Sequence, residues 1–538
     1  MATVAGEPGR YEEKGLFART ATGLVRGWSV WDGFVYAAFS INLVTLGLYA
    51  FSFAPFIPEQ GLLWAVVLSG AYLVFQAITY SSLIAAMPRA GGDYIWISRV
   101  LGGGIGFVLA AAGWWFILWH WVPIYANILN IEVFGPISAI IGWERGISFW
   151  AEPWGIFVAS VIVAAGASVL VALGLRTYAR FQKICFYGGL VGLAVMFVLL
   201  LVHSKSDFIS AYNDRAPDLY GSPTYEATLA AGQYDSGNVG SFAFTGIFLL
   251  IPFILFFNLW SNWGATLYGE VRGASDFRNN VKAMGGALLA TTAVAAIFLL
   301  LFAKTFGWDF YNGANNAYWG GAEGGPGFWP YPGMMAAFFF DNAVLQFLVI
   351  GLLSLWFFGW MGSVFLSSTR VVFATAFDRV LPEWAAKVGR NGVPTGALAL
   401  MLVPAIPIAA FYAWDGDGFR TWTLNATLVI AITFLGSAVS AAVFPWRRPE
   451  IYNASPIAKY RVAGIPLITV AAVLFSAILL FSLWQWWRDD RYFVNDRDSF
   501  IYLGCMYLLA IAIYFGSRLW RKRQGIDMGM VQREIPAE

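Results

Sequence analysis

The sequence predicts an all-α polytopic membrane protein with twelve transmembrane helices. Hydrophobic residues make up 59% of the 538 residues, and charged residues make up only 12%. The charged share is about half of that in an average soluble protein. Apolar runs of about 20 residues, the length that crosses a bilayer as a helix, recur along the whole chain. So few charges leave no room for a large soluble domain.

Twelve apolar windows define the expected membrane spans. In chain order they are 30–56, 62–86, 104–133, 155–174, 184–202, 242–268, 284–302, 343–376, 396–413, 423–444, 465–484 and 500–515. Several exceed the roughly 20 residues that a bilayer requires, so we expect tilted helices or helices that extend beyond the membrane.

The distribution of positive charge predicts the orientation. Roughly three quarters of the 33 Lys and Arg residues fall on the side that holds both termini and the loops after even-numbered spans. Because cytoplasmic loops are enriched in these residues, both termini are predicted to lie in the cytoplasm, with the protein in the cytoplasmic membrane. The polar segment 1–20 lacks the apolar region of a signal peptide, so the first span should be retained.

Composition also narrows the function. A net charge of +2 without a basic patch predicts no nucleic-acid partner. Two His and two Cys without clustering predict neither a metal site nor a disulfide. No nucleophile–base arrangement is visible, so we expect neither an enzyme nor a resident cofactor. The expected partners are a small organic solute and the lipid bilayer, and the sequence does not indicate an oligomeric state.

The sixth span carries polar residues at its middle. Residues 256–264 read FFNLWSNWG, which places two Asn and one Ser where lipid offers no hydrogen-bond partners. Discontinuous helices near the midplane form binding sites in secondary transporters. The alternative is an intact helix whose amides bond to neighbouring helices. The sequence leaves both alternatives open.

The first span has polar residues at a similar depth, namely Ser40, Asn42 and Thr45. We predict that the Asn side chains of spans one and six orient a ligand, and that Phe257 or Trp260 provides an aromatic wall. The residues predicted to bind substrate are Ser40, Ile41, Asn42, Thr45, His120, Phe256, Phe257, Asn258, Trp260 and Ser261.

His120 lies in the middle of the third span, among Trp115, Trp119 and Trp121. Ionisable groups at membrane depth are candidates for function, and His titrates near neutral pH. We predict a neutral His120 that hydrogen-bonds the substrate or is protonated only transiently. The alternative is a neutral His that bonds to a neighbouring helix.

Three segments on the predicted cytoplasmic side form a recognisable set. They are MPRAGGDYIWISRVLG at 87–102, GEVR at 269–272, and STR at 368–370 followed by FDRVLPE at 377–383, with NGVP at 391–394 next. In this order they resemble the amino acid–polyamine–organocation (APC) superfamily of transporters, over roughly residues 28–444. The resemblance implies a five-plus-five inverted repeat, formed by helices 1–5 and 6–10, with two extra C-terminal helices.

The resemblance also implies a function and a layout. The function is secondary active transport of an amino acid or a related small organic solute, such as an amine or an organic acid, by alternating access. A membrane-embedded solute sensor is the alternative. The implied layout is a tail at 1–29, a first repeat at 30–203, an outer loop at 204–240, a second repeat at 241–445, helices eleven and twelve at 464–516, and a tail at 517–538. The outer loops 204–240 and 307–333 are expected to form an ordered cap.

The charged residues at the cytoplasmic ends of the spans predict an inner gate. Asp32, Arg99, Glu270 and Arg370, with Asp378, Arg89 and Arg379 nearby, are placed to form ion pairs there, or else to serve as static helix-end charges. The coupling ion, assigned by the family resemblance, is Na⁺, H⁺ or absent. Ser363 and Ser367 are the candidate Na⁺ ligands, although transmembrane Ser commonly bonds to the preceding turn. The glycine-rich break typical of the family's first helix is reduced to Gly47.

Overall fold

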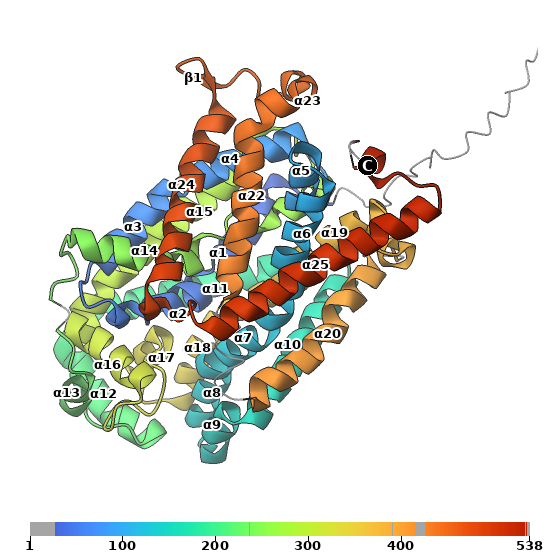
Figure 1. Ribbon diagram of the computed structural model, residues 1–538. Helices are drawn as coiled ribbons and strands as arrows, with labels where there is room; N and C mark the ends of the chain where they lie inside the picture. The colour runs from blue at the N-terminus through green and yellow to red at the C-terminus, as the bar shows by residue number, and fades with distance from the viewer. Residues whose placement is uncertain (1–26, 236, 390, 416–424, 533, 535–538) are drawn as a thin grey trace, which may run out of the picture.

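The computed structural model describes residues 27–235, 237–389, 391–415, 425–532 and 534 (Figure 1). Within these residues, twelve helical segments are long and apolar enough to cross a membrane. The prediction of an all-α protein with twelve membrane helices is therefore confirmed. We number these segments helix one to helix twelve. Their division into two inverted repeats stays a prediction.

The first six membrane helices include several that change helical type along their length. Helix one joins α1 (Val30–Ile41), the π-helical η1 (Leu43–Gly47) and α2 (Leu48–Phe51), and helix two joins α3 (Leu62–Tyr72) and α4 (Val74–Ala86). Helix three joins α6 (Gly103–Ala111), η3 (Ala112–Phe116), α7 (Ile117–Leu129), η4 (Asn130–Phe134) and α8 (Gly135–Ile140). Helices four and five are α10 (Pro153–Ala172) and α11 (Leu175–Val202), and helix six joins α14 (Phe244–Asn258) and the 3₁₀-helical η5 (Trp263–Glu270).

The second six are more regular. Helix seven is α15 (Phe277–Phe302), continued by η6 (Ala303–Gly307), and helix eight joins α18 (Ala343–Met361) and α19 (Ser363–Phe377). Helices nine to twelve are α20 (Thr395–Trp414), α22 (Ala426–Arg447), α24 (Leu467–Arg488) and α25 (Arg497–Arg523). In Figure 1, α22 and α24 run side by side, and α25 crosses the bundle obliquely, packing against α6.

One end of the bundle carries a helical cap. It consists of α12 (Lys205–Tyr220), α13 (Tyr225–Gly232), α16 (Trp308–Gly320) and α17 (Pro332–Ala337), at the lower left of Figure 1, with α9 (Glu144–Ala151) nearby. Stacked rings of Tyr225 and Phe310, with centroids 4.1 Å apart, join α13 to α16. The segments 205–232 and 308–320, expected as loops, are thus mostly helical, because their aromatic side chains give the helices a face to bury.

The opposite end holds the segments with the family-like motifs. There lie α5 (Asp93–Val100), η7 (Glu383–Ala386), α23 (Pro449–Ala454) and a hairpin of β1 (Arg461–Val462) with β2 (Ile465–Pro466). The hairpin is antiparallel, with Arg461 opposite Pro466. Three short elements complete the structure, namely η2 (Ala54–Phe56), η8 (Asp490–Tyr492) and α26 (Met528–Val531).

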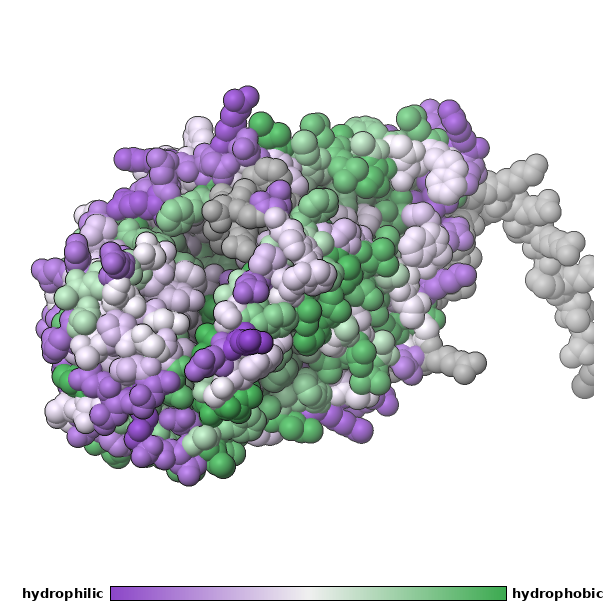
Figure 2. Space-filling view, turned by 90° about the horizontal axis from the view of Figure 1, so that it is seen from below, coloured by the Kyte–Doolittle hydropathy of each residue, from purple (hydrophilic) through white to green (hydrophobic). Residues whose placement is uncertain are grey.

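Large apolar side chains face outward on several membrane helices. Ile184 on helix five, Val403 on helix nine and Leu508 on helix twelve are each at least 65% exposed. Figure 2 shows hydrophobic residues forming a belt between two ends where hydrophilic residues gather. Exposed apolar surface of this extent requires an apolar environment, so the protein is a multi-pass membrane protein.

Candidate substrate-binding site

Helix one is interrupted at Asn42. This residue has a left-handed backbone (φ 46°, ψ 82°), a conformation that Asn tolerates better than most residues. Its Oδ1 accepts from the Thr45 backbone N–H (3.2 Å), and its Nδ2 donates to the Trp356 carbonyl on helix eight (3.2 Å). Asn42 therefore ends α1, caps the π-helical segment that follows, and ties the interruption to helix eight.

Helix six is interrupted between Asn258 and Trp263, as the first alternative for this span predicts, but the two Asn side chains bond to a neighbouring helix, as the second predicts. Gln76 of helix two supports the non-helical turn. Its Nε2 donates to the Leu259 carbonyl (2.7 Å) and to Asn262 Oδ1 (3.0 Å), and its Oε1 accepts from the Ser261 hydroxyl (3.2 Å). Because lipid cannot satisfy freed backbone groups, a buried side chain such as Gln76 must do so.

Asn258 is also held by helix two, since its Nδ2 donates to the Ser69 hydroxyl (2.8 Å). The sequence analysis missed both partners on helix two. Ser69 and Gln76 are seven residues apart, which places them on one helix face. Two polar residues on one face of an apolar span were the feature of the sequence that could have indicated these partners.

The two interrupted helices approach each other closely at Gly47. A Cβ atom on Gly47 would lie 3.0 Å from the Phe257 ring, so a larger residue would push the helices apart. Phe257 also packs edge-to-face on Phe51, with ring centroids 5.3 Å apart. The outer halves of helices one and six are therefore in direct contact.

Three indole rings fill the space beside the break in helix six. Trp260 lies edge-on to Trp121 of helix three, with centroids 5.2 Å apart, and to Trp263, at 5.5 Å. Trp121 and Trp263 stack at 5.6 Å. The Trp260 indole donates to the Phe256 carbonyl (2.7 Å). Phe257 or Trp260 was predicted to form an aromatic wall of the substrate site. Trp260 packs here against Trp121 of helix three, whereas Phe257 packs on helix one, and a role of either ring in binding substrate stays a prediction.

An apolar cavity lies on the side of this cluster that faces the helical cap, which is the outer side in the predicted orientation. It has a volume of about 100 Å³ and reaches inward as far as Phe256. The residues that line it are uncharged, namely Tyr49, Ala50, Phe53, Pro252, Phe253, Phe256, Thr427, Leu428, Trp486, Tyr492, Phe493 and Val494. They come from helices one, six and ten and from the segment around the end of helix eleven. We call this space the outer cavity.

The structure does not gather all the predicted substrate-binding residues at one place. Phe256 and Trp260 lie together by the outer cavity, whereas Asn258 and Ser261 point to helix two. Ser40 donates to the Tyr36 carbonyl within its own helix (2.8 Å), and Ile41 is fully buried. Contact of these residues with a substrate stays a prediction.

His120 lies on another face of helix three. Its Nε2 is hydrogen-bonded to the Tyr502 hydroxyl of helix twelve. Trp115 and Trp119 also face away from the break, since both indoles donate to the Leu400 carbonyl of helix nine (3.2 and 3.1 Å). The geometry thus corresponds to the alternative in which His120 bonds to a neighbouring helix.

The end of the bundle that holds α5 is closed by buried ion pairs, and we call it the inner end after the predicted orientation. Arg370 Nε lies 2.8 Å from Glu270 Oε1, and both side chains are at most 2% exposed. Arg99 pairs with Asp378, with 3.0 Å between Nη2 and Oδ1. Asp32 caps α1 and lies 3.1 Å from Lys183 Nζ. The four residues predicted for an inner gate therefore form three separate pairs, and Lys183 is the one partner that was not expected at this gate.

Two other features seal this end. Trp28 is buried between helices, with its indole donating to the Leu175 carbonyl (3.2 Å) and its backbone N–H to the Glu270 carbonyl (3.2 Å). Gly92 has φ 40°, and a Cβ there would lie 3.0 Å from the Thr266 backbone. The Gly-Gly of the 87–102 motif is thus explained by a tight turn pressed against η5.

Comparison with known proteins agrees with this geometry. The family described as "Amino acid permease" matches residues 31–514. The chain belongs to the amino acid permease family. It is also 23% identical over 481 residues to the branched-chain amino acid permease BcaP of Lactococcus lactis subsp. cremoris (strain MG1363), a match that covers 86% of this chain and 88% of that protein. Membership in the APC superfamily is confirmed, and the protein is an amino acid transporter.

The candidate Na⁺ ligands of the permease are engaged in protein contacts. The Ser367 hydroxyl donates to the Trp263 carbonyl (2.9 Å) and lies 2.8 Å from the Tyr36 hydroxyl. The Ser363 hydroxyl lies 3.4 Å from the Tyr125 hydroxyl. These contacts link helix eight to helices one, three and six, whether or not an ion also binds there.

A buried carboxylate in the permease was not among the predicted site residues. Glu132 lies in η4 of helix three and is 1% exposed, and its Oε1 accepts from the Thr45 hydroxyl (3.1 Å). Within the part of the chain that the structure describes, its Oε2 has no hydrogen-bond partner and no cation pairs with it. The available signal was an acidic residue within an apolar stretch, one residue before the expected end of the third span at residue 133.

Proposed function

We propose that the permease moves an amino acid with an apolar side chain across the cytoplasmic membrane by alternating access. The observation that carries this proposal is the asymmetry between its two ends. Buried ion pairs close the inner end, while the outer cavity extends from the other side as far as Phe256, two residues before the end of α14. A carrier that exposes one side at a time requires such an arrangement.

The residues that line the outer cavity favour an amino acid with an apolar side chain as the substrate. Its lining is uncharged and mostly aromatic or aliphatic, which suits an apolar side chain. The breaks at Asn42 and at 259–262 supply backbone groups for the ammonium and carboxylate groups of the substrate. The relative BcaP is named for branched-chain amino acids, and this supports the same class here.

Uptake into proteoliposomes tests the proposal. Purified permease should accumulate radiolabelled isoleucine, with competition from unlabelled valine and leucine and none from aspartate or lysine. Liposomes without protein are the control. Binding of isoleucine without uptake would instead support a solute sensor, and competition by charged amino acids would contradict the substrate class.

We propose H⁺ as the coupling ion, with Glu132 as the group that carries it. An ionised carboxylate without a cation is costly in a buried site, so Glu132 is protonated in this state. Its partner Thr45 belongs to the interrupted part of helix one. Movement of that segment would admit water to Glu132 and allow it to release its proton.

The Glu132→Gln variant separates coupling from transport. It should keep exchange of labelled for unlabelled isoleucine but lose accumulation driven by a pH gradient. The matched control is Glu144→Gln, which changes an exposed carboxylate on α9. Accumulation that depends on a Na⁺ gradient and ignores a pH gradient would overturn this assignment.

We also propose that both termini lie in the cytoplasm. The end that holds α5, α23 and the β-hairpin carries most of the Lys and Arg residues between helices, as the positive-inside rule requires. A cysteine introduced at Gly464, in the hairpin, should react with an impermeant maleimide only after the cells are opened.

A further inference from the structure

The connection between helices eleven and twelve crosses the outer face of the permease. Residues 489–496 include η8 and then Phe493, whose left-handed backbone (φ 56°) turns the chain back toward the bundle. Tyr492, Phe493 and Val494 form part of the wall of the outer cavity. We call residues 489–496 the outer strap.

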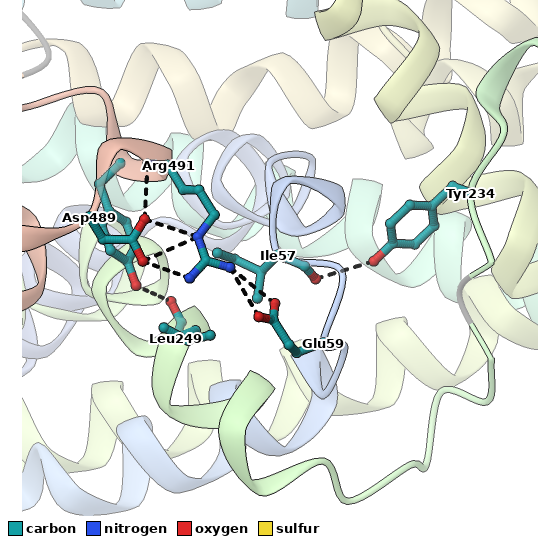
Figure 3. A network of polar contacts seen from close by, with 7 residues as sticks. Ile57, Glu59, Tyr234, Leu249, Asp489 and Arg491 are labelled. Atoms are coloured by element: carbon teal, nitrogen blue, oxygen red, sulfur yellow. Dashed lines mark hydrogen bonds and ion pairs between the residues drawn. The ribbon is translucent and has the colours of Figure 1, made fainter.

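Arg491 joins the outer strap to the connection between helices one and two. Its Nη1 lies 3.1 and 3.2 Å from the two carboxylate oxygens of Glu59, and its Nη2 lies 2.6 Å from Asp489 Oδ2 (Figure 3). One guanidinium therefore bridges two carboxylates, binding Asp489 through Nε and Nη2 in a bidentate contact, the specific geometry for Arg, and Glu59 through Nη1. Its hydrogen bonds hold the pKa of Asp489 below the usual value.

Two aromatic residues join the outer strap to the outer parts of helices one and six. The Tyr492 hydroxyl donates to the Leu249 carbonyl of helix six (2.7 Å), and its ring lies 5.0 Å from that of Phe253. The Phe493 ring packs edge-to-face on Phe56, with centroids 5.5 Å apart. The outer strap thus contacts helix six directly and contacts the η2 turn that follows helix one.

The connection between helices one and two is held from its other side as well. The Tyr234 hydroxyl donates to the Ile57 carbonyl (3.3 Å), and Gln60 Nε2 donates to the Asp235 carbonyl (2.9 Å). Figure 3 shows Ile57 and Glu59 between Tyr234 and Arg491. Residues 57–60 are therefore fixed between the strap and the segment that follows the cap helix α13.

We propose that the outer strap is the outer gate of the permease, and that separation of Arg491 from Glu59 frees the outer ends of helices one and six to widen the outer cavity. This proposal rests on the alternating-access function proposed above. The exposure of the pair fits a gate that opens repeatedly. The side chains of Arg491 and Glu59 are 35% and 36% exposed, so water compensates both charges when they part. The buried ion pairs at the inner end have no water nearby to hydrate their charges if they separate.

Cysteine accessibility tests the outer strap directly. The reporter is Leu428→Cys, in the wall of the outer cavity, in a background carrying Cys185→Ala and Cys505→Ser. We expect Arg491→Ala and Glu59→Gln each to raise the rate of modification by an impermeant methanethiosulfonate reagent about two- to fivefold, which is the upper part of the range for an ion pair between two groups that are each about one-third exposed. The double variant should react no faster than the quicker single variant, because both changes break the same contact.

The matched control is Arg488→Ala. Arg488 precedes the strap and lies over the Trp484 ring, at 4.8 Å from its centroid. Its removal should leave the reporter rate unchanged. Arg491→Lys, which keeps the charge but cannot bridge both carboxylates in the same way, should give an intermediate rate.

Two results distinguish a failure of the gate proposal from a failure of the proposed transport function. In the protein with the intact strap, isoleucine should change the reporter rate if alternating access is correct. If isoleucine changes that rate while Arg491→Ala and Glu59→Gln do not, the strap is not the gate. If isoleucine neither changes the rate nor is taken up, the proposed function fails. A melting temperature within a few degrees of the parent protein excludes misfolding as the cause of faster labelling.

Discussion

Glu270 and Arg370 form a buried, two-point ion pair at the inner end of the permease. Besides the 2.8 Å contact from Nε, Arg370 Nη2 lies 3.3 Å from the second oxygen of Glu270. Glu270 ends the inner half of helix six, and Arg370 lies on helix eight. The pair therefore holds the broken helix against a continuous one.

Removing one partner of this pair should open the inner end. Glu270→Gln leaves a buried guanidinium without its anion, which costs about 3–5 kcal/mol of the inner-closed state. We expect a Thr266→Cys reporter, buried in η5, to react faster with an impermeant thiol reagent in inside-out vesicles, and uptake to fall. The control is Glu450→Gln, which removes the exposed partner of Arg448. Equal reporter rates in both variants would show that this pair is not a gate.

Replacing Gln76 should reduce uptake more than replacing another buried Gln. Gln76→Ala leaves the Leu259 carbonyl without its side-chain donor, at a cost of about 1–3 kcal/mol, and frees the turn that breaks helix six. We expect lower melting temperature and lower uptake. Gln346→Ala is the matched control, since Gln346 also donates to a backbone carbonyl, that of Phe340 (2.9 Å), away from the break. It should lower the melting temperature while uptake persists. Normal uptake by Gln76→Ala would contradict the role of the turn.

Trp260 should limit substrate size. Trp260→Ala removes the indole that fills the space between Trp121 and Trp263, at a cost of about 3–5 kcal/mol of stability. If the variant folds, phenylalanine and tryptophan should compete with isoleucine more strongly than they do in the parent protein. Trp143→Ala serves as control, because Trp143 is 46% exposed. An unchanged order of competitors would place Trp260 outside the substrate path.

His120 should act through helix twelve rather than through the substrate. Because its ring faces Tyr502, we expect His120→Gln and Tyr502→Phe to lower the melting temperature to a similar extent. Uptake measured from pH 5.5 to 7.5 should keep the shape of the parent profile. A flattened profile in His120→Gln alone would instead return His120 to the transport mechanism, as the sequence analysis proposed.

The sequence by itself determined the class of this protein. Twelve spans were predictable because the length and hydropathy of a run of about 20 residues are local properties. The family could also be named from the inner segments, since tight turns and charged helix ends at the membrane surface leave short, recognisable motifs such as the Gly-Gly at 91–92.

The pairing of side chains between spans was decided only by the tertiary structure. Asn42, Asn258 and Ser261 lie at or beside the interruptions of helices one and six, but composition cannot show that helix two, rather than a ligand, bonds to the amides of helix six. Arg99 and Asp378 are 279 residues apart, and His120 and Tyr502 are 382 residues apart. Such contacts depend on how each helix is rotated about its axis and where it breaks. Those choices follow from the packing of all twelve helices together, and no single span contains that information.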